Sequence, residues 1–157
     1  MNNEYRASVV VRTVAYILAA PLIVFGLYVI LHGHLTPGGG FAGGAIMATF
    51  IALFLVSFGR KGAGSLHRNL FSVLESLGLT VFVVLAFLGI SNTFFYNFMV
   101  NSGHLFGRVI SFGVNPGYLD TGGVIPLMNI AVGLEVFSAI SLIVLEMFTY
   151  SREDKND

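Results

Sequence analysis

The chain has 157 residues, of which 55% are hydrophobic and only 10% are charged, and its formal net charge is zero. A soluble domain carries about a quarter charged residues, so this composition favours a protein whose solvent is lipid. The neutral balance argues against a nucleic-acid partner, and the lack of cysteine excludes disulfides, iron–sulfur clusters and thiolate metal sites in this chain.

Apolar stretches long enough to cross a bilayer, which takes about 20 helical residues, recur along the chain. In order they cover residues 9–31, 41–58, 70–95 and 124–150. The first is too long for the apolar part of a signal peptide, so we expect it to remain as a span, kinked at Pro21. The fold class is therefore all-α, with residues 1–157 forming a single polytopic membrane domain of four transmembrane helices.

Lysine and arginine are distributed unevenly between the two sides of this arrangement. One of the eight, Arg108, falls in a predicted external connection. The other seven fall at the termini or in the loop after the second span: Arg6, Arg12, Arg60, Lys61, Arg68, Arg152 and Lys155. The positive-inside rule therefore predicts that both termini are cytoplasmic.

A long connection over residues 96–123 is expected on the external side. It is too polar and too rich in glycine for a fifth span, and we expect a short interfacial helix around residues 101–112. Asp120 or Thr121 is placed to cap the fourth helix, where Pro126 fits the first turn. Asn129 lies just inside the membrane, where asparagine commonly forms hydrogen bonds between helices.

Glutamates within the predicted spans are functional candidates, because an ionisable group is costly in the membrane. Glu135 lies near the middle of the fourth span, and Glu146 follows eleven residues, or three turns, later on nearly the same face. Glu75 lies in the first turns of the third span, at an expected depth similar to that of Glu146. The three could form a polar track for protons or Na⁺. Alternatively, each pairs with a basic or backbone group, which for Glu75 and Glu146 could be Arg68 or Arg152.

The most unusual segment covers residues 32–44 and reads His-Gly-His-Leu-Thr-Pro-Gly-Gly-Gly-Phe-Ala-Gly-Gly. Thr-Pro begins a turn, the following glycines permit positive φ, and the final Gly-Gly pair permits close helix approach. His32 and His34 would make a poor metal site without further ligands, so no metal is expected. We favour a rigid turn that packs against another part of the molecule, and direct proton or ion handling by His34 is the alternative.

This segment resembles the motif that follows the first helix in the MnhB-like component of multisubunit Na⁺/H⁺ antiporters of the Mrp or Mnh type. The length and the four-span plan are also similar to that family. The motif maps onto His34, Pro37, Gly38, Gly39, Gly40, Phe41, Gly43 and Gly44. Residues 115–132 look more like MnhB-like components of archaeal complexes, in which the antiporter module is joined to a membrane-bound hydrogenase or a related ferredoxin-driven reductase.

The resemblance implies a small subunit of a plasma-membrane complex that exchanges Na⁺ for H⁺. Its partners would be other antiporter subunits, large proton-pumping subunits related to those of respiratory complex I and, in a hydrogenase-type complex, hydrogenase and iron–sulfur subunits. No cofactor or catalytic residue is implied for this chain, which we expect not to be an enzyme by itself. Glu135, Glu146, Glu75 and His34 are candidates for the ion path on physical grounds alone. The alternatives are a purely structural membrane subunit and a free-standing small carrier.

Overall fold

The computed structural model describes residues 7–110 and 117–153, and at residues 60–61 and 152–153 it describes the backbone alone. In this part of the chain the helices are α1 (Val9–Leu31), α2 (Gly39–Ser65), α3 (Arg68–Leu88) and α4 (Ile125–Glu153), with a short 3-10 turn, η1 (Leu119–Thr121). All four α-helices are long and apolar enough to cross a membrane. The prediction of an all-α protein with four spans is confirmed for the described residues.

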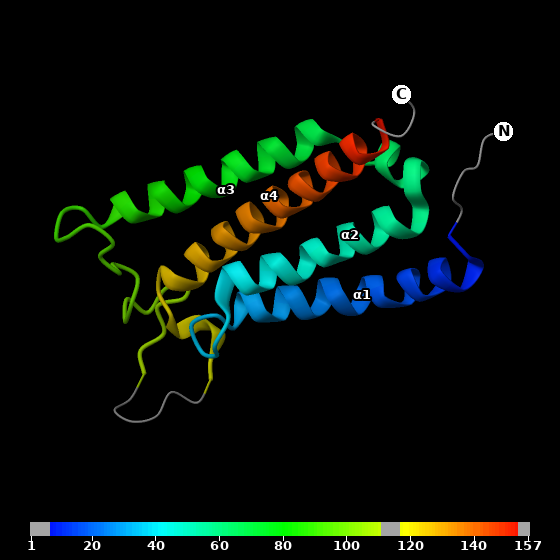
Figure 1. Ribbon diagram of the computed structural model, residues 1–157. Helices are drawn as coiled ribbons and strands as arrows, with labels where there is room; N and C mark the ends of the chain where they lie inside the picture. The colour runs from blue at the N-terminus through cyan, green and yellow to red at the C-terminus, as the bar shows by residue number, and fades with distance from the viewer. Residues whose placement is uncertain (1–6, 111–116, 154–157) are drawn as a thin grey trace.

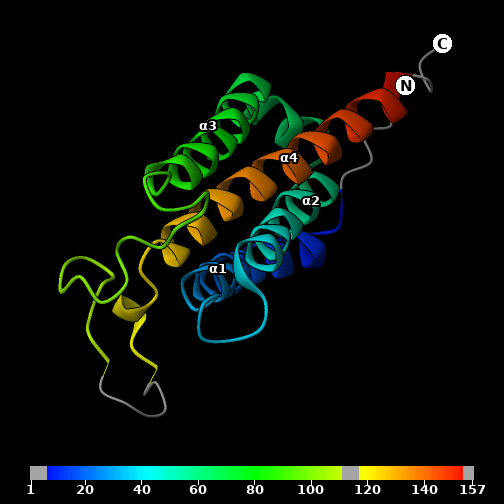
Figure 2. The same ribbon diagram turned by 90° about the vertical axis from the view of Figure 1, so that its left-hand side faces the viewer.

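The helices lie side by side in the order α1, α2, α4, α3 (Figures 1 and 2). The first turn of α1 and the last turn of α4 lie at the same end of this row, which we call the terminal end (Figure 1). The opposite end, the loop end, carries the connections between α1 and α2 and between α3 and α4. Neighbours α2 and α4 are therefore parallel, whereas the α1–α2 and α3–α4 pairs are antiparallel.

The charge bias used to orient the chain falls partly outside the described residues. Arg6 and Lys155 lie outside them, and the side chains of Arg60, Lys61 and Arg152 are likewise not described. The placement of the termini in the cytoplasm therefore stays a prediction.

Helix α1 has the bounds predicted from its hydropathy and continues through Pro21. Ser8 caps its first turn, since the Ser8 hydroxyl oxygen accepts a hydrogen bond from the Val11 N–H at 3.3 Å.

Helix α2 is longer than the predicted span of 41–58. Its membrane-length part is Gly39–Gly59, and the helix resumes after Gly59 and runs to Ser65. Gly59 has φ 59° and ψ −137°, a conformation that glycine adopts readily, so the chain bends there. Hydropathy could not predict the last turns, because the residues after Gly59 are polar although their backbone is helical.

Helix α3 ends at Leu88, so the prediction that it extends to residue 95 is wrong. The chain reverses at Gly89, where the Asn92 N–H donates to the Gly89 carbonyl and the Phe95 N–H donates to the Ala86 carbonyl, both at 3.1 Å. The Phe95 ring lies 5.8 Å from that of Phe82, so this apolar stretch folds back onto α3. The connection to α4 therefore begins at Gly89 rather than at Tyr96.

The interfacial helix expected over residues 101–112 does not form in its described part, residues 101–110. That stretch is a series of turns, in which the Gly103 N–H donates to the Gly107 carbonyl and the Gly107 N–H to the His104 carbonyl, both at 2.8 Å. Residues 111–112 lie outside the described residues. Closely spaced glycines favour such turns over a helix.

The two halves of the row are packed differently. Toward the terminal end, α2, α3 and α4 meet in a buried cluster of Ile51, Leu55, Phe71 and Leu145. Toward the loop end, α3 and α4 leave a half-open, largely apolar pocket of about 270 Å³ between residues such as Leu77 and Leu134. Its lining side chains carry no group suited to bind an ion, so it is not a candidate ion site.

Candidate functional site

The glycine-rich motif packs against the start of α4. The Gly40 N–H donates a hydrogen bond of 3.4 Å to the Asn129 side-chain oxygen, so the predicted contact of Asn129 between helices is confirmed. A Cβ atom added at Gly44 would lie only 2.7 Å from the Gly133 carbonyl oxygen. The turn thus brings the backbones of α2 and α4 together, which is the packing role favoured for this motif.

His34 joins the two connections at the loop end. Its Nε2 lies 3.4 Å from the Tyr118 carbonyl oxygen, so this nitrogen donates. Its Nδ1 is buried and has no partner among the described residues. His32 turns elsewhere, with Nδ1 3.0 Å from the Tyr28 carbonyl oxygen and its ring 4.0 Å from the Tyr28 ring. The two histidines do not converge, and the described residues contain no group of three or more metal-ligating side chains.

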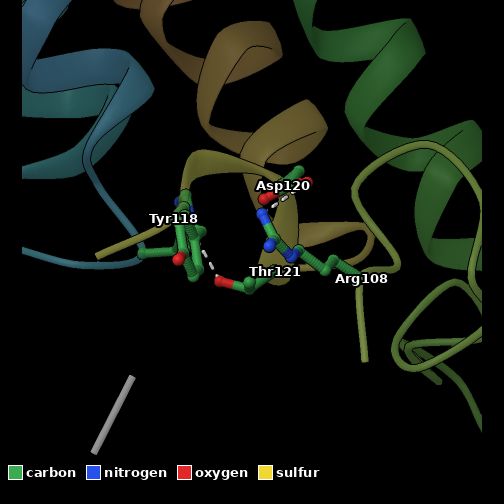
Figure 3. Close-up of polar contacts among 5 residues, drawn as sticks. Arg108, Tyr118, Asp120 and Thr121 are labelled. Atoms are coloured by element: carbon green, nitrogen blue, oxygen red, sulfur yellow. Dashed lines mark hydrogen bonds and ion pairs between the residues drawn. The ribbon is translucent and has the colours of Figure 1, made fainter. Parts of the chain in front are cut away.

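Polar contacts join distant parts of the long connection at the loop end (Figure 3). The Arg108 guanidinium lies 3.9 Å from the centre of the Tyr118 ring and 3.8 Å from the Asp120 carboxylate. The backbone N–H of Arg108 also donates a hydrogen bond to the backbone carbonyl of Asp120 at 3.0 Å. Both charged side chains are half exposed, so we expect the ion pair to contribute at most about 1 kcal/mol.

Asn97 caps α4 from 27 residues away in the chain. Its side-chain oxygen accepts from the Val124 N–H at 2.9 Å, and its side-chain nitrogen donates to the Gly122 carbonyl at 3.0 Å. The expectation that Asp120 or Thr121 caps this helix is therefore wrong. Asp120 pairs with Arg108, and the Thr121 hydroxyl donates to the Tyr118 carbonyl at 2.8 Å. Local sequence rules missed Asn97 because the contact depends on how the connection folds.

Replacing Asn97 with alanine should lower the melting temperature of the protein in detergent, because the Val124 N–H, directly before the first residue of α4, loses its acceptor. Loss of a capping side chain costs about 1 kcal/mol, and up to about 2 kcal/mol. Asn92→Ala is the matched control, because Asn92 lies in the same connection, is exposed, and forms no side-chain hydrogen bond among the described residues. Equal melting temperatures for the two variants would show that the Asn97 cap contributes nothing.

Four charged residues of α3 and α4 lie along the contact between these helices, and we call them the polar seam (Arg68, Glu75, Glu135 and Glu146). Arg68 and Glu146 form an ion pair of 3.0 Å, as the pairing interpretation predicted for Glu146. A Cβ atom at Gly78 would lie 3.0 Å from the Cβ of Glu135. Because Cβ atoms three residues apart in a helix are about 5–6 Å apart, the Cβ atoms of Glu75 and Glu135 lie within about 9 Å.

This register corrects the expected depth of Glu75. Arg68, not Glu75, is level with Glu146, and Glu75 lies seven residues, or about 10 Å, further toward the loop end. Glu75 and Glu135 are therefore neighbours across the seam. Sequence alone could not predict that Glu75 and Glu135 are neighbours, because the relative position of α3 and α4 along their axes depends on the close contact at Gly78.

Glu135 lies ten residues, or about 15 Å, from the start of α4, which is half the thickness of a bilayer core of about 30 Å. Its side chain and that of Glu75 are half-buried, and neither forms a hydrogen bond or ion pair with the described residues. One turn beyond Glu135, Ser138 is fully buried, and its hydroxyl has no partner in the same part of the chain. Ser141 donates to the Phe137 carbonyl at 2.5 Å.

Four long apolar helices with carboxyl groups at mid-helix define a polytopic helical membrane protein. Residues 10–142 match the family of domains related to the MnhB subunit of Na⁺/H⁺ antiporters, and the chain belongs to this family. An uncharacterized protein of Methanocaldococcus jannaschii is 31% identical over 135 residues, which cover 84% of this chain and 49% of that protein. A Na⁺/H⁺ antiporter subunit of Bacillus subtilis is 31% identical over 84 residues, or 54% of this chain and 59% of the relative. The matched parts thus cover only about half of each of these relatives.

Proposed function

We propose that this chain is a small membrane subunit of an Mrp-type Na⁺/H⁺ antiporter module in the plasma membrane, with both termini cytoplasmic. The observation that carries the proposal is the family match over residues 10–142. The name of the Bacillus subtilis relative supports it. The partners would be the other antiporter subunits and large pumping subunits related to those of respiratory complex I, and the chain would not be an enzyme by itself.

Within such a module, Glu135 and Glu75 would support the ion path. Their carboxyl groups could hold a proton or Na⁺ near mid-membrane, and they are the half-buried members of the seam without a partner among the described residues. Glu146 fits a structural role better, because it lies eleven residues nearer the terminal end, where it pairs with Arg68 at 3.0 Å and both side chains are half exposed. The glycine-rich motif with His34 would hold α2 and α4 together at the loop end.

Purification of the tagged chain from its own host in mild detergent, with mass spectrometry of its partners, tests this proposal. Co-purifying antiporter subunits alone would support a secondary antiporter driven by an ion gradient. The same subunits together with hydrogenase and iron–sulfur proteins would extend the proposal to a redox-driven complex. A chain that purifies alone would contradict the proposal and favour a free-standing carrier.

A further inference from the structure

The carboxyl group of Glu135, expected near mid-membrane, lacks a polar partner among the described residues. The side chain is half-buried, so part of it faces away from this chain, and it has no hydrogen bond or ion pair with the described residues. Hydrocarbon offers no hydrogen-bond partner, and a carboxyl group facing lipid at this depth is strongly disfavoured. Something outside the described contacts must therefore cover it.

The basic residues of α2, α3 and α4 are too distant to do so. Arg68 is occupied by Glu146 and lies ten residues, or about 15 Å, from Gly78, which contacts Glu135. Arg152 is seventeen residues further along α4, or about 25 Å. Arg60 follows Gly44, which packs beside Gly133 and Phe137, by sixteen residues, or about 24 Å. Lys61 lies beyond it.

A second copy of the chain is also a poor match. Residues 13–31, 39–59, 69–88 and 125–151, which form the apolar parts of the helices, contain no lysine, arginine or histidine. A symmetric contact at this level would therefore set Glu135 and Glu75 against the same acids of the other copy. Like charges in a low-dielectric setting repel strongly, so the covering surface should belong to a different protein.

We propose that the polar seam is the contact surface for a transmembrane helix of another subunit, which places a lysine or arginine side chain against Glu135 near mid-membrane. The inference rests on the proposed place of the chain in a multisubunit complex. A cation meets the charge of Glu135 and can reach Glu75, whose Cβ lies within about 9 Å of that of Glu135. The contact would end at the Arg68–Glu146 pair, where the charges of the seam are already balanced.

Apolar side chains beside the acids would be covered by the same helix. Leu79 follows Glu75 by four residues and is 51% exposed, and Ile143 follows Glu135 by eight residues and is 56% exposed. Around the helix axis, Leu79 lies about 40° from Glu75 and Ile143 about 80° from Glu135, so each is on the same side of its helix as its glutamate. They are suitable probe positions, because an enlarged side chain there does not disturb the packing of α3 against α4.

Photo-crosslinking in the intact complex tests the inference. A benzoylphenylalanine residue is placed at Leu79 or, separately, at Ile143, with Ile17 of α1 as the control at the other edge of the row, where the exposed fraction is 66%. We expect both seam probes to form an adduct with the same partner helix. The Leu79 adduct should lie within about one turn of a lysine or arginine and the Ile143 adduct about two turns further toward the terminal end, whereas the Ile17 probe does not label that helix.

A charge exchange provides the second readout. Glu135→Lys should reduce co-purification of that partner at least tenfold, and replacing the partner's basic residue with glutamate should restore it, which a general folding defect would not allow. Seam adducts with lipid only, with a second copy, or with a helix lacking a basic residue would overturn the inference and leave the proposed function standing. Absence of any antiporter subunit from the preparation would instead overturn the proposed function.

Discussion

Replacing Glu135 with glutamine is expected to reduce Na⁺/H⁺ exchange at least about tenfold in everted membrane vesicles that contain the assembled complex. Glutamine keeps the size of the side chain and much of its hydrogen bonding but cannot release or accept a proton. Groups that transfer protons at a site typically change rates by roughly 10²–10⁴-fold, so the loss should be large if the carboxyl group takes part. Exchange is measured from the ion-induced change in the vesicle pH gradient and is divided by the amount of complex.

Glu146→Gln is the matched control for this prediction. Glu146 lies on the same helix but is half exposed and paired with Arg68, so its loss should cost at most about 1 kcal/mol of stability. We expect that variant to retain most of its exchange. Unchanged exchange in the Glu135 variant, with the complex intact, would remove Glu135 from the ion path and favour a purely structural subunit.

Replacing Gly44 with leucine is expected to prevent α2 and α4 from packing. Even a single added Cβ would lie 2.7 Å from the Gly133 carbonyl oxygen and 3.0 Å from the Phe137 backbone nitrogen. Overpacking commonly costs about 1–3 kcal/mol, and more here because backbone atoms on the facing helix cannot rotate away. The amount of monodisperse protein recovered on size-exclusion chromatography in mild detergent should fall severalfold.

Gly64→Leu provides the control for overpacking. Gly64 also lies on α2, but a Cβ atom there would meet nothing within 4 Å. We expect normal recovery of monodisperse protein, because the leucine side chain clashes with no neighbouring atom and replaces a glycine, which disfavours helix. A similar loss in both variants would mean that the expression system, rather than the α2–α4 contact, responds to added leucine.

Hydropathy predicted the helix bounds well where a segment is both apolar and helical, as in α1. It predicted them wrongly where a segment is apolar but not helical, or helical but not apolar. Phe94 and Phe95 are apolar yet non-helical, because the chain turns back at Gly89 and places their rings against Phe87 and Phe82 of α3. The residues after Gly59 are polar yet helical. The average hydropathy of a segment indicates whether it prefers lipid or water, but it does not predict where the backbone turns.

The candidate site divides in a similar way. Composition and position predicted that Glu135 lies near the middle of a span, and the structure places it ten residues into the long apolar helix α4; its depth in a membrane stays a prediction. The pairing of Arg68 with Glu146, the position of Glu75 and the cap formed by Asn97 all depend on how segments distant in sequence meet. Rules for helix caps consider only residues close in sequence. They therefore predicted that the nearer Asp120 or Thr121, rather than Asn97, caps α4.

The order of the helices in the row has a consequence for biosynthesis. Helix α4 leaves the ribosome after α1, α2 and α3, yet it lies between α2 and α3 and is the main packing partner of both. The α1–α2 hairpin can pair as soon as it is inserted, whereas α3 must wait beside the translocon, or in lipid, without its principal neighbour. Helix α4 then has to enter between two segments already in the bilayer, so a nascent chain cut off before Ile125 would leave α3 without its main packing partner and open to membrane quality-control proteases.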